Sequence, residues 1–199
     1  MSIKLVLGLG NPGREYADTR HNIGWQVLDA LASREKLSWK SDRAFDAAIT
    51  RWAHPSGRTV LLAKPQTYMN DSGSSARALA EYFKIQPTAI AGIYDDLNID
   101  LGRVKVSASG SAGGHNGVDS LMQAIGPRFV RYRIGIGPKE PRQMDLKDFV
   151  LGKFTPEQRL VVAQHLTQYV SGLDLLLTSG TSRAMNQLNR RDQHEPEQP

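Results

Sequence analysis

The 199-residue sequence contains no cysteine, which excludes disulfide bonds, thiolate nucleophiles and cysteine-based metal sites. It also has no run approaching the ~20 apolar residues needed to cross a bilayer. The apolar stretch after Met1 ends at Gly8 and is too short for a secretory signal peptide. We therefore expect a cytoplasmic protein with no membrane partner.

Patterns typical of metal and serine-nucleophile sites are missing or incomplete. The five histidines show no ligand spacing such as His-x-x-x-His, and Gly-x-Ser-x-Gly does not occur. The segment 96–102 begins like a calcium-binding loop, but Gly102 falls one place late. Ser107 stands where such a loop needs its bidentate Glu. We expect no metal.

The segment 8–13 matches the dinucleotide-binding pattern Gly-x-Gly-x-x-Gly and follows a predicted strand. Pro12 lies inside the pattern, and the next helix start is predicted only at Asp18 or Thr19. The third glycine therefore does not open a helix onto a pyrophosphate. We interpret the segment as a tight turn that presents Asn11 at the carboxyl end of a strand, and we expect no cofactor.

Hydrophobic periodicity predicts strands that alternate with helices. The expected strands are 3–9, 44–52, 58–64, one ending at Ile93–Tyr94, one around Val104 and Val106, and 132–136. The expected helices begin at 18 or 19, at 71 or 72, near 116 and near 156, and the last covers 181–190. The order predicts an α/β fold: one three-layer α/β/α domain over residues 1–190. The hairpin at 44–64 predicts a mixed, mostly parallel, twisted sheet, and polar residues 191–199 are expected to form a flexible tail.

The formal net charge of +5 mildly favours a polyanionic partner. Residues 100–153 hold most of the excess, with nine lysines and arginines against five acids. Charge alone favours RNA binding about as much as it favours an ordinary solvated surface.

Several polar side chains lie close to the predicted ends of strands. They are Asn11, His21, Asn70, Asp95 directly after a strand, and Asn116 after the glycine-rich loop 109–114. Such positions can converge on one rim of a sheet. A neutral imidazole can take a proton from water when a carboxylate fixes its tautomer. Asparagine amides can hold a peptide, orient the water and stabilise an oxyanion. A lone histidine near a helix start is more often structural, but this set indicates a hydrolase.

The same segments closely resemble the bacterial-type peptidyl-tRNA hydrolases. The similarity runs from residue 3 to about 190, and its motifs occur in order. They are residues 8–16 (GLGNPGREY), 19–24 (TRHNIG), 68–73 (YMNDSG), 95–97 (DDL), 113–117 (GGHNG) and 131–137 (RYRIGIG).

The resemblance implies cleavage of the ester between a peptide and the 3′ ribose of tRNA, which recycles tRNA from abandoned translation without metal or cofactor. By position in the motifs, His21 is expected to be the general base and Asp95 to orient and polarise it. Asn11 and Asn70 are expected to bind the peptidyl portion near the reacting carbonyl, and Asn116 to help hold the catalytic water.

The resemblance also assigns residues around this centre. His115 and Tyr16 are expected at the rim of the cleft, and Met69 beside the peptide. Lys105 and Arg133 are candidates for the phosphates of the tRNA acceptor stem. Family members often carry a second lysine two places after Lys105, where this chain has Ser107. One lost phosphate contact weakens RNA affinity without removing it.

Two other functions compete with this interpretation. A non-catalytic RNA-binding protein on the same scaffold, like the plant members that assist intron splicing, would keep the basic residues and lose the site. All the expected catalytic positions are filled here, which favours the enzyme. An ordinary peptidase or esterase would need no basic cluster. No sequence feature determines the oligomeric state, and a monomer is the default expectation.

Overall fold

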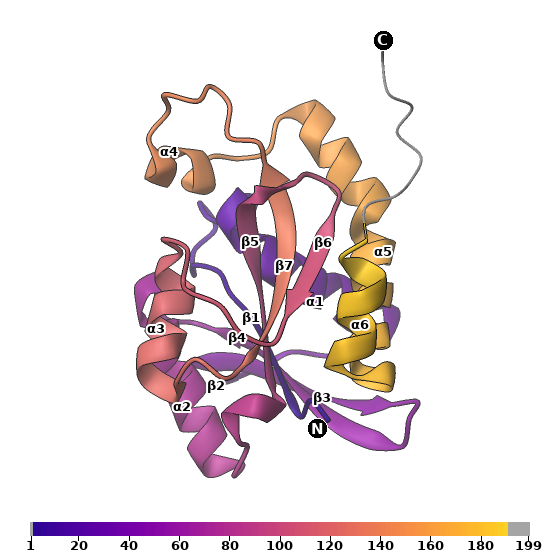
Figure 1. Ribbon diagram of the computed structural model, residues 1–199. Helices are drawn as coiled ribbons and strands as arrows, with labels where there is room; N and C mark the ends of the chain where they lie inside the picture. Colours follow the sequence, from indigo (N-terminus) through magenta and orange to yellow (C-terminus); the bar gives the residue numbers. More distant parts are fainter. Residues whose placement is uncertain (1, 191–199) are drawn as a thin grey trace.

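A seven-stranded mixed sheet runs through the centre of the computed structural model, which describes residues 2–190 (Figure 1). Its strands are β1 (Leu5–Gly8), β2 (Lys40–Asp42), β3 (Ala47–His54), β4 (Arg58–Pro65), β5 (Ile90–Asp100), β6 (Val104–Ser107) and β7 (Val130–Gly137). They lie in the order β2-β3-β4-β1-β5-β7-β6. The four central strands are parallel, and antiparallel neighbours lie at both edges. The predicted mixed, mostly parallel sheet is confirmed.

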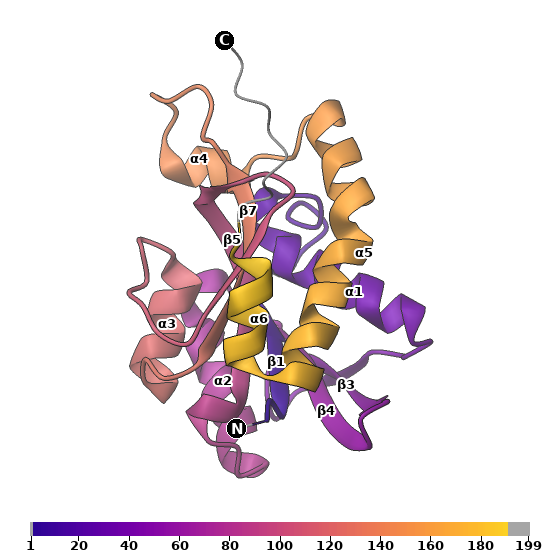
Figure 2. The same cartoon turned by 45° about the vertical axis from the view of Figure 1, so that its right-hand side comes forward.

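Helices cover both faces of this sheet. They are α1 (Ile23–Arg34), α2 (Ser72–Tyr82), α3 (Asn116–Ile125), α4 (Leu146–Leu151), α5 (Pro156–Ser179) and α6 (Thr181–Leu188), with the 3₁₀ turns η1 (Arg20–Asn22), η2 (Met69–Asp71) and η3 (Pro87–Ala89). One core lies between the sheet and α1, α5 and α6, and the other lies between the sheet and α2 and α3 (Figures 1 and 2). The predicted three-layer α/β/α architecture is confirmed.

The central strand β1 shows why its sequence reads as one continuous apolar run. Val6 packs into the core beneath α1, whereas Leu5 and Leu7 pack into the core beneath α2 and α3. Alternate side chains point to opposite faces, so a strand buried on both faces needs apolar residues at every position. β1 lies between β4 and β5, with both pairings parallel.

The predicted strand boundary next to Asp95 is wrong. The strand expected to end at Tyr94 continues through Asp95 to Asp100, so Asp95 lies inside β5 and not in a turn after it. The register between β5 and β7 shifts between Asp96 and Asp100. Glycines of β7 make this extension possible, because a Cβ at Gly135 would meet the Asp100 carbonyl oxygen and one at Gly137 the Leu97 carbonyl oxygen, both at 2.0 Å.

One strand and one α-helix were not predicted. β2 has three residues, all polar, and α4 has Phe149 as its one buried residue, so neither carries a readable hydrophobic period. The segment 191–199, expected to be a tail, lies outside the described residues. Within residues 2–190 no helix combines the length and apolar character that a bilayer crossing requires.

Candidate active site

A cleft of about 850 Å³ brings together most of the residues expected from the sequence. The predicted residues among its lining are Asn11, Tyr16, His21, Met69, Asn70, Asp95, His115, Asn116 and Arg133. They come from the loop after β1, from η1, η2, β5 and β7, and from the start of α3. The predicted convergence on one rim of the sheet is therefore present. Lys105 is not among the lining residues.

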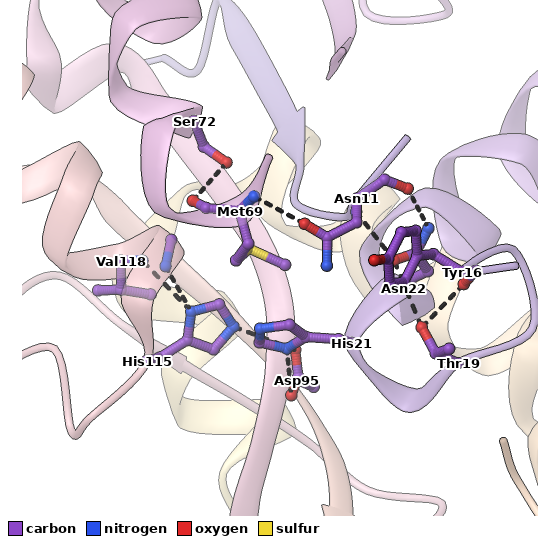
Figure 3. Close-up of polar contacts among 11 residues, drawn as sticks. Asn11, Tyr16, Thr19, His21, Asn22, Met69, Ser72, Asp95, His115 and Val118 are labelled. Carbon is purple, nitrogen blue, oxygen red and sulfur yellow. Dashed lines mark hydrogen bonds and ion pairs between the residues drawn. The ribbon is translucent and has the colours of Figure 1, made fainter. Parts of the chain in front are cut away.

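Asp95 lies at the centre of this cleft and binds two histidines (Figure 3). Its Oδ1 and Oδ2 lie 2.8 and 3.0 Å from Nδ1 of His21. Oδ1 also lies 3.0 Å from Nε2 of His115. The Asp95 carboxylate is buried, and the two imidazole rings lie with their centroids 4.7 Å apart. His115, expected at the rim, is instead part of the centre.

The backbone of α3 fixes which nitrogen of His115 carries a proton. His115 precedes the helix, and its Nδ1 accepts hydrogen bonds from the N–H groups of Gly117 and Val118. A neutral imidazole that accepts at Nδ1 must carry its proton on Nε2, which then donates to Asp95. Asp95 in turn accepts the Nδ1–H of His21. The Nε2 of His21 is therefore left with a free lone pair.

The electrostatics of the centre keep Asp95 ionised. Burial alone would raise the pKa of its carboxyl, but the interactions with His21 and His115, including their N–H hydrogen bonds, outweigh burial, so the pKa lies below its usual range. Tyr94, which lies beside His115 and lines the cleft, has its pKa shifted in the opposite direction. Burial raises the pKa of Tyr94 to about 12, so its hydroxyl stays neutral and is no base near pH 7.

Asn11 is held by three hydrogen bonds, one through its side chain and two through its backbone. Its Oδ1 accepts from the Met69 N–H at 2.7 Å, while the side chain of Asn22 binds both the N–H and the carbonyl of Asn11 at 2.9 Å. The amide nitrogen of Asn11 therefore points away from Met69 (Figure 3). Asn22 is fully buried and was not singled out from the sequence, although it follows His21 directly in the motif.

Asn70 and Asn116 are exposed at the surface of the cleft, and Tyr16 is half-buried there. Asn116 is the first residue of α3. Met69 is buried below them, and a Cβ at Gly117 would lie 2.4 Å from its sulfur. The glycine after Asn116 is thus needed for the start of α3 to approach Met69 closely.

Comparisons with known proteins agree with this geometry. A family model described as peptidyl-tRNA hydrolase matches residues 5–196. The chain belongs to the peptidyl-tRNA hydrolase family. The peptidyl-tRNA hydrolase of Gloeobacter violaceus is 42% identical over 200 aligned residues, covering 100% of both chains. That of Aquifex aeolicus is 40% identical and covers 96% of this chain and 99% of its own. The solved peptidyl-tRNA hydrolase of Acinetobacter baumannii matches with a TM-score of 0.87, 36% identity and 96% coverage of both chains.

Another arginine of the family motif 131–137 supports the glycine-rich loop of the cleft. Arg131 is 1% exposed, and its guanidinium donates to the carbonyl of Gly110 at 2.6 Å and to those of Pro127 and Phe129. The guanidinium also lies 4.4 Å from the centroid of the Phe129 ring. In the sequence, Arg131 is recognisable only as part of a motif, and this structural role was not predicted.

The expected RNA-binding residues lie together on the two last strands of the sheet. Lys105 of β6 stands opposite Arg133 of β7 in the antiparallel register. Arg133 donates to Asp96 at 3.3 Å, and its side chain is 29% exposed. Ser107, which also lines the cleft, adds no charge there. A partly exposed cation pair thus continues from the cleft.

Within residues 2–190, His21, Asp95 and His115 form the cluster of potential metal ligands. Their mutual contacts of 2.8–3.0 Å are hydrogen-bond distances, and both imidazoles direct protonated nitrogens at the carboxylate. A metal ion needs the lone pairs of those nitrogens. The arrangement fits proton transfer better than metal binding.

Proposed function

We propose that this chain hydrolyses the ester between the peptide and the 3′ ribose of peptidyl-tRNA, with His21 as general base. The observation that carries the proposal is the double hydrogen bond of Asp95. Its carboxylate engages Nδ1 of His21 while α3 fixes His115 in the opposite tautomer. Nε2 of His21 is then the basic nitrogen in a cleft of about 850 Å³.

In the proposed reaction, water attacks the ester carbonyl while its proton passes to Nε2 of His21. The imidazolium that forms is stabilised by the Asp95 carboxylate. The tetrahedral intermediate then collapses and breaks the bond to the 3′ oxygen of the ribose. That oxygen takes the proton back from His21, and the free carboxylic acid of the peptide leaves.

Asparagine side chains supply neutral hydrogen-bond donors for the developing negative charge. Asn11 is the best prepared of them, because its oxygen is already bound to Met69 and its amide nitrogen is left for a ligand. Such a fixed donor stabilises an oxyanion without reorganising during the reaction. We propose that Asn70 holds the peptidyl portion near Asn11, with Met69 and Tyr16 beside the peptide, and that Asn116 holds the water.

The nucleic-acid part of the substrate is proposed to bind beside this centre. Lys105 and Arg133 face each other across the last strand pair, and phosphate contacts of this kind position RNA without reading its sequence. We propose that the chain acts as a monomer in the cytoplasm, where translation supplies its substrate.

The experiment is the release of free tRNA from N-acetyl-aminoacyl-tRNA. We expect the wild type to cleave this substrate and to act little on unblocked aminoacyl-tRNA. The His21→Ala variant should lose about 10³-fold in kcat, since it lacks the base.

The matched control for this variant is His165→Ala. His165 lies on α5 with its Nδ1 bonded to the Val161 carbonyl, and it is not among the cleft residues. This variant should cleave at the wild-type rate. Full activity in His21→Ala would reject the proposed mechanism, and equal cleavage of an N-acetylated amino-acid ester without RNA would reject tRNA as the recognised partner.

A further inference from the structure

Arg20 is a buried cation directly before the proposed base, yet its side chain binds a different part of the molecule. It is 7% exposed. Nη1 donates to the Phe149 carbonyl at 3.2 Å, and Nη2 donates to Oε1 of Gln158 at 2.7 Å. The guanidinium carbon also lies 4.5 Å from the centroid of the Phe149 ring and 5.4 Å from that of Phe154. Among residues 2–190 no carboxylate forms an ion pair with it.

The helix that carries Phe149, α4, forms a wall of the cleft. α4 lies beyond the ends of β5 and β7 (Figure 1), and Leu146, Lys147, Val150 and Leu151 line the cleft. α4 has only six residues, and Phe149 is the buried one. So short a helix is marginal without tertiary support. Its position depends on the few contacts it makes with the body of the protein.

The turn that carries the base contacts both α4 and the residues that follow it. The Arg20 guanidinium binds a carbonyl in the last turn of α4, which is the end of a helix that a cation stabilises. The Arg20 backbone N–H donates to the Gly152 carbonyl at 3.1 Å, and Thr19 forms a β-bridge with Lys153. The turn η1 therefore joins two sides of the cleft, with His21 bound to β5 and Arg20 bound to α4 and α5.

We propose that Arg20 is a positioning residue that fixes α4 as a wall of the substrate cleft. The proposal rests on the proposed function, because that cleft is taken to bind the substrate. His21 is held by both oxygens of Asp95, and these contacts do not involve the Arg20 side chain. Loss of Arg20 therefore weakens substrate binding more than it slows the chemical step.

The test compares Arg20→Met and Arg20→Lys with the wild type. Met keeps the apolar stem and loses every donor, while Lys keeps the charge and loses the forked geometry. We expect KM for N-acetyl-aminoacyl-tRNA to rise about tenfold in Arg20→Met and less in Arg20→Lys, with kcat nearly unchanged. Hydrogen exchange at the amides of α4 should become faster, while exchange in β1 and β5 stays as in the wild type.

Gln158→Glu is expected to strengthen the contact between Arg20 and α5 and so to hold α4 more firmly. Gln158 is the third residue of α5 and forms a capping box with Thr155, a role that Glu also fills. The new carboxylate would give Arg20 an ionic partner. We expect slower exchange in α4 and a KM at or below the wild-type value. The same change in the Arg20→Met background should bring no gain.

Arg58→Met is the matched control, because Arg58 also donates to a backbone carbonyl, that of Leu177, and is not among the cleft residues. It should leave KM and the exchange of α4 unchanged. Unaltered KM and α4 exchange in both Arg20 variants would overturn the proposal, as would a fall in kcat at constant KM. If the wild type released no tRNA, the proposed function would fail, while exchange in α4 would still test the Arg20 anchor.

Discussion

The two parts of the cleft are built in different ways. At the Asp95 centre the carboxylate oxygens, both nitrogens of His115 and Nδ1 of His21 have hydrogen-bond partners, and the tautomers of His21 and His115 follow from Asp95 and the backbone of α3. At the proposed RNA-binding face, Arg133 is 29% exposed and makes one ion pair, with Asp96. Groups that act on developing charge benefit from a fixed geometry. Groups that bind phosphate act through charge and tolerate a mobile side chain.

Asp95→Asn removes the charge that joins the two histidines, and we expect it to cause the largest loss of activity. Both oxygens of Asp95 lie within 3.0 Å of Nδ1 of His21, so in either orientation of the amide its NH₂ group faces an imidazole nitrogen that must then present a lone pair. His21 or His115 is forced into the wrong tautomer. We expect kcat to fall on the order of 10³- to 10⁴-fold, measured by tRNA release. A fall of less than tenfold would show that Asp95 does not set the tautomer.

The same variant has an effect on stability that depends on pH. The lowered pKa of Asp95 means that its ionised form stabilises the fold above the pKa of an unfolded aspartate, about 3.9. This contribution is lost as pH falls toward the lower pKa of the folded state. Asn does not titrate, so thermal melts below about pH 5 should show a shallower loss of Tm in Asp95→Asn than in the wild type.

His115 tests whether the second histidine supports the first. His115→Asn keeps a side chain that can cap α3 but does not place a protonated nitrogen on Asp95. We expect kcat to fall about 10- to 100-fold with little change in Tm. His115→Ala should lose the cap as well and melt at a lower temperature. Wild-type kcat in His115→Asn would confine the role of His115 to capping.

Arg133→Glu tests the outer face. Charge reversal should raise KM about tenfold at low salt and change kcat little, because Arg133 does not contact the Asp95 centre. The dependence of KM on salt should also become weaker, which a titration with KCl measures. Equal KM in mutant and wild type across salt concentrations would place the RNA elsewhere.

Asp96→Asn is expected to give the smallest effect and forms a matched pair with Asp95→Asn. The two carboxylates are adjacent in β5, but Asp96 faces Arg133 and not the histidines. Loss of the Asp96 charge leaves Arg133 free to bind phosphate, so KM should fall. We expect a change of about twofold, because a partly exposed ion pair contributes little free energy. A loss of kcat like that of Asp95→Asn would mean that the two regions are not separate.

Much of the fold follows from the sequence because most elements bury a periodic apolar face. α1 and the β3–β4 hairpin are of this kind, and β1 is recognisable as a continuous apolar run buried on both faces. β2 and α4 were not predicted because their short, mostly exposed segments carry no such pattern. The end of β5 was misplaced because Asp95 reads as a polar residue that ends a strand, whereas its charge is satisfied by histidines brought in from η1 and α3.

The members of the site were predictable, but their pairing was not. Motif positions identify His21, Asp95, Asn11 and Asn116, and the structure places all four at the cleft. No local rule indicates that His115 binds Asp95, since that contact depends on where α3 begins relative to β5. The buried supports are Asn22, Arg131 and Arg20, which bind backbone carbonyls distant in sequence, and a single sequence does not show such contacts.

The central claim is that Asp95 and α3 impose opposite tautomers on the two histidines. Nitrogen NMR of ¹⁵N-imidazole-labelled protein, at a pH where both rings are neutral, measures this directly. We predict that His21 carries its proton on Nδ1 and His115 on Nε2, with the His21 pattern lost in Asp95→Asn. A proton on Nε2 of neutral His21 would leave no lone pair facing the cleft and would contradict the account.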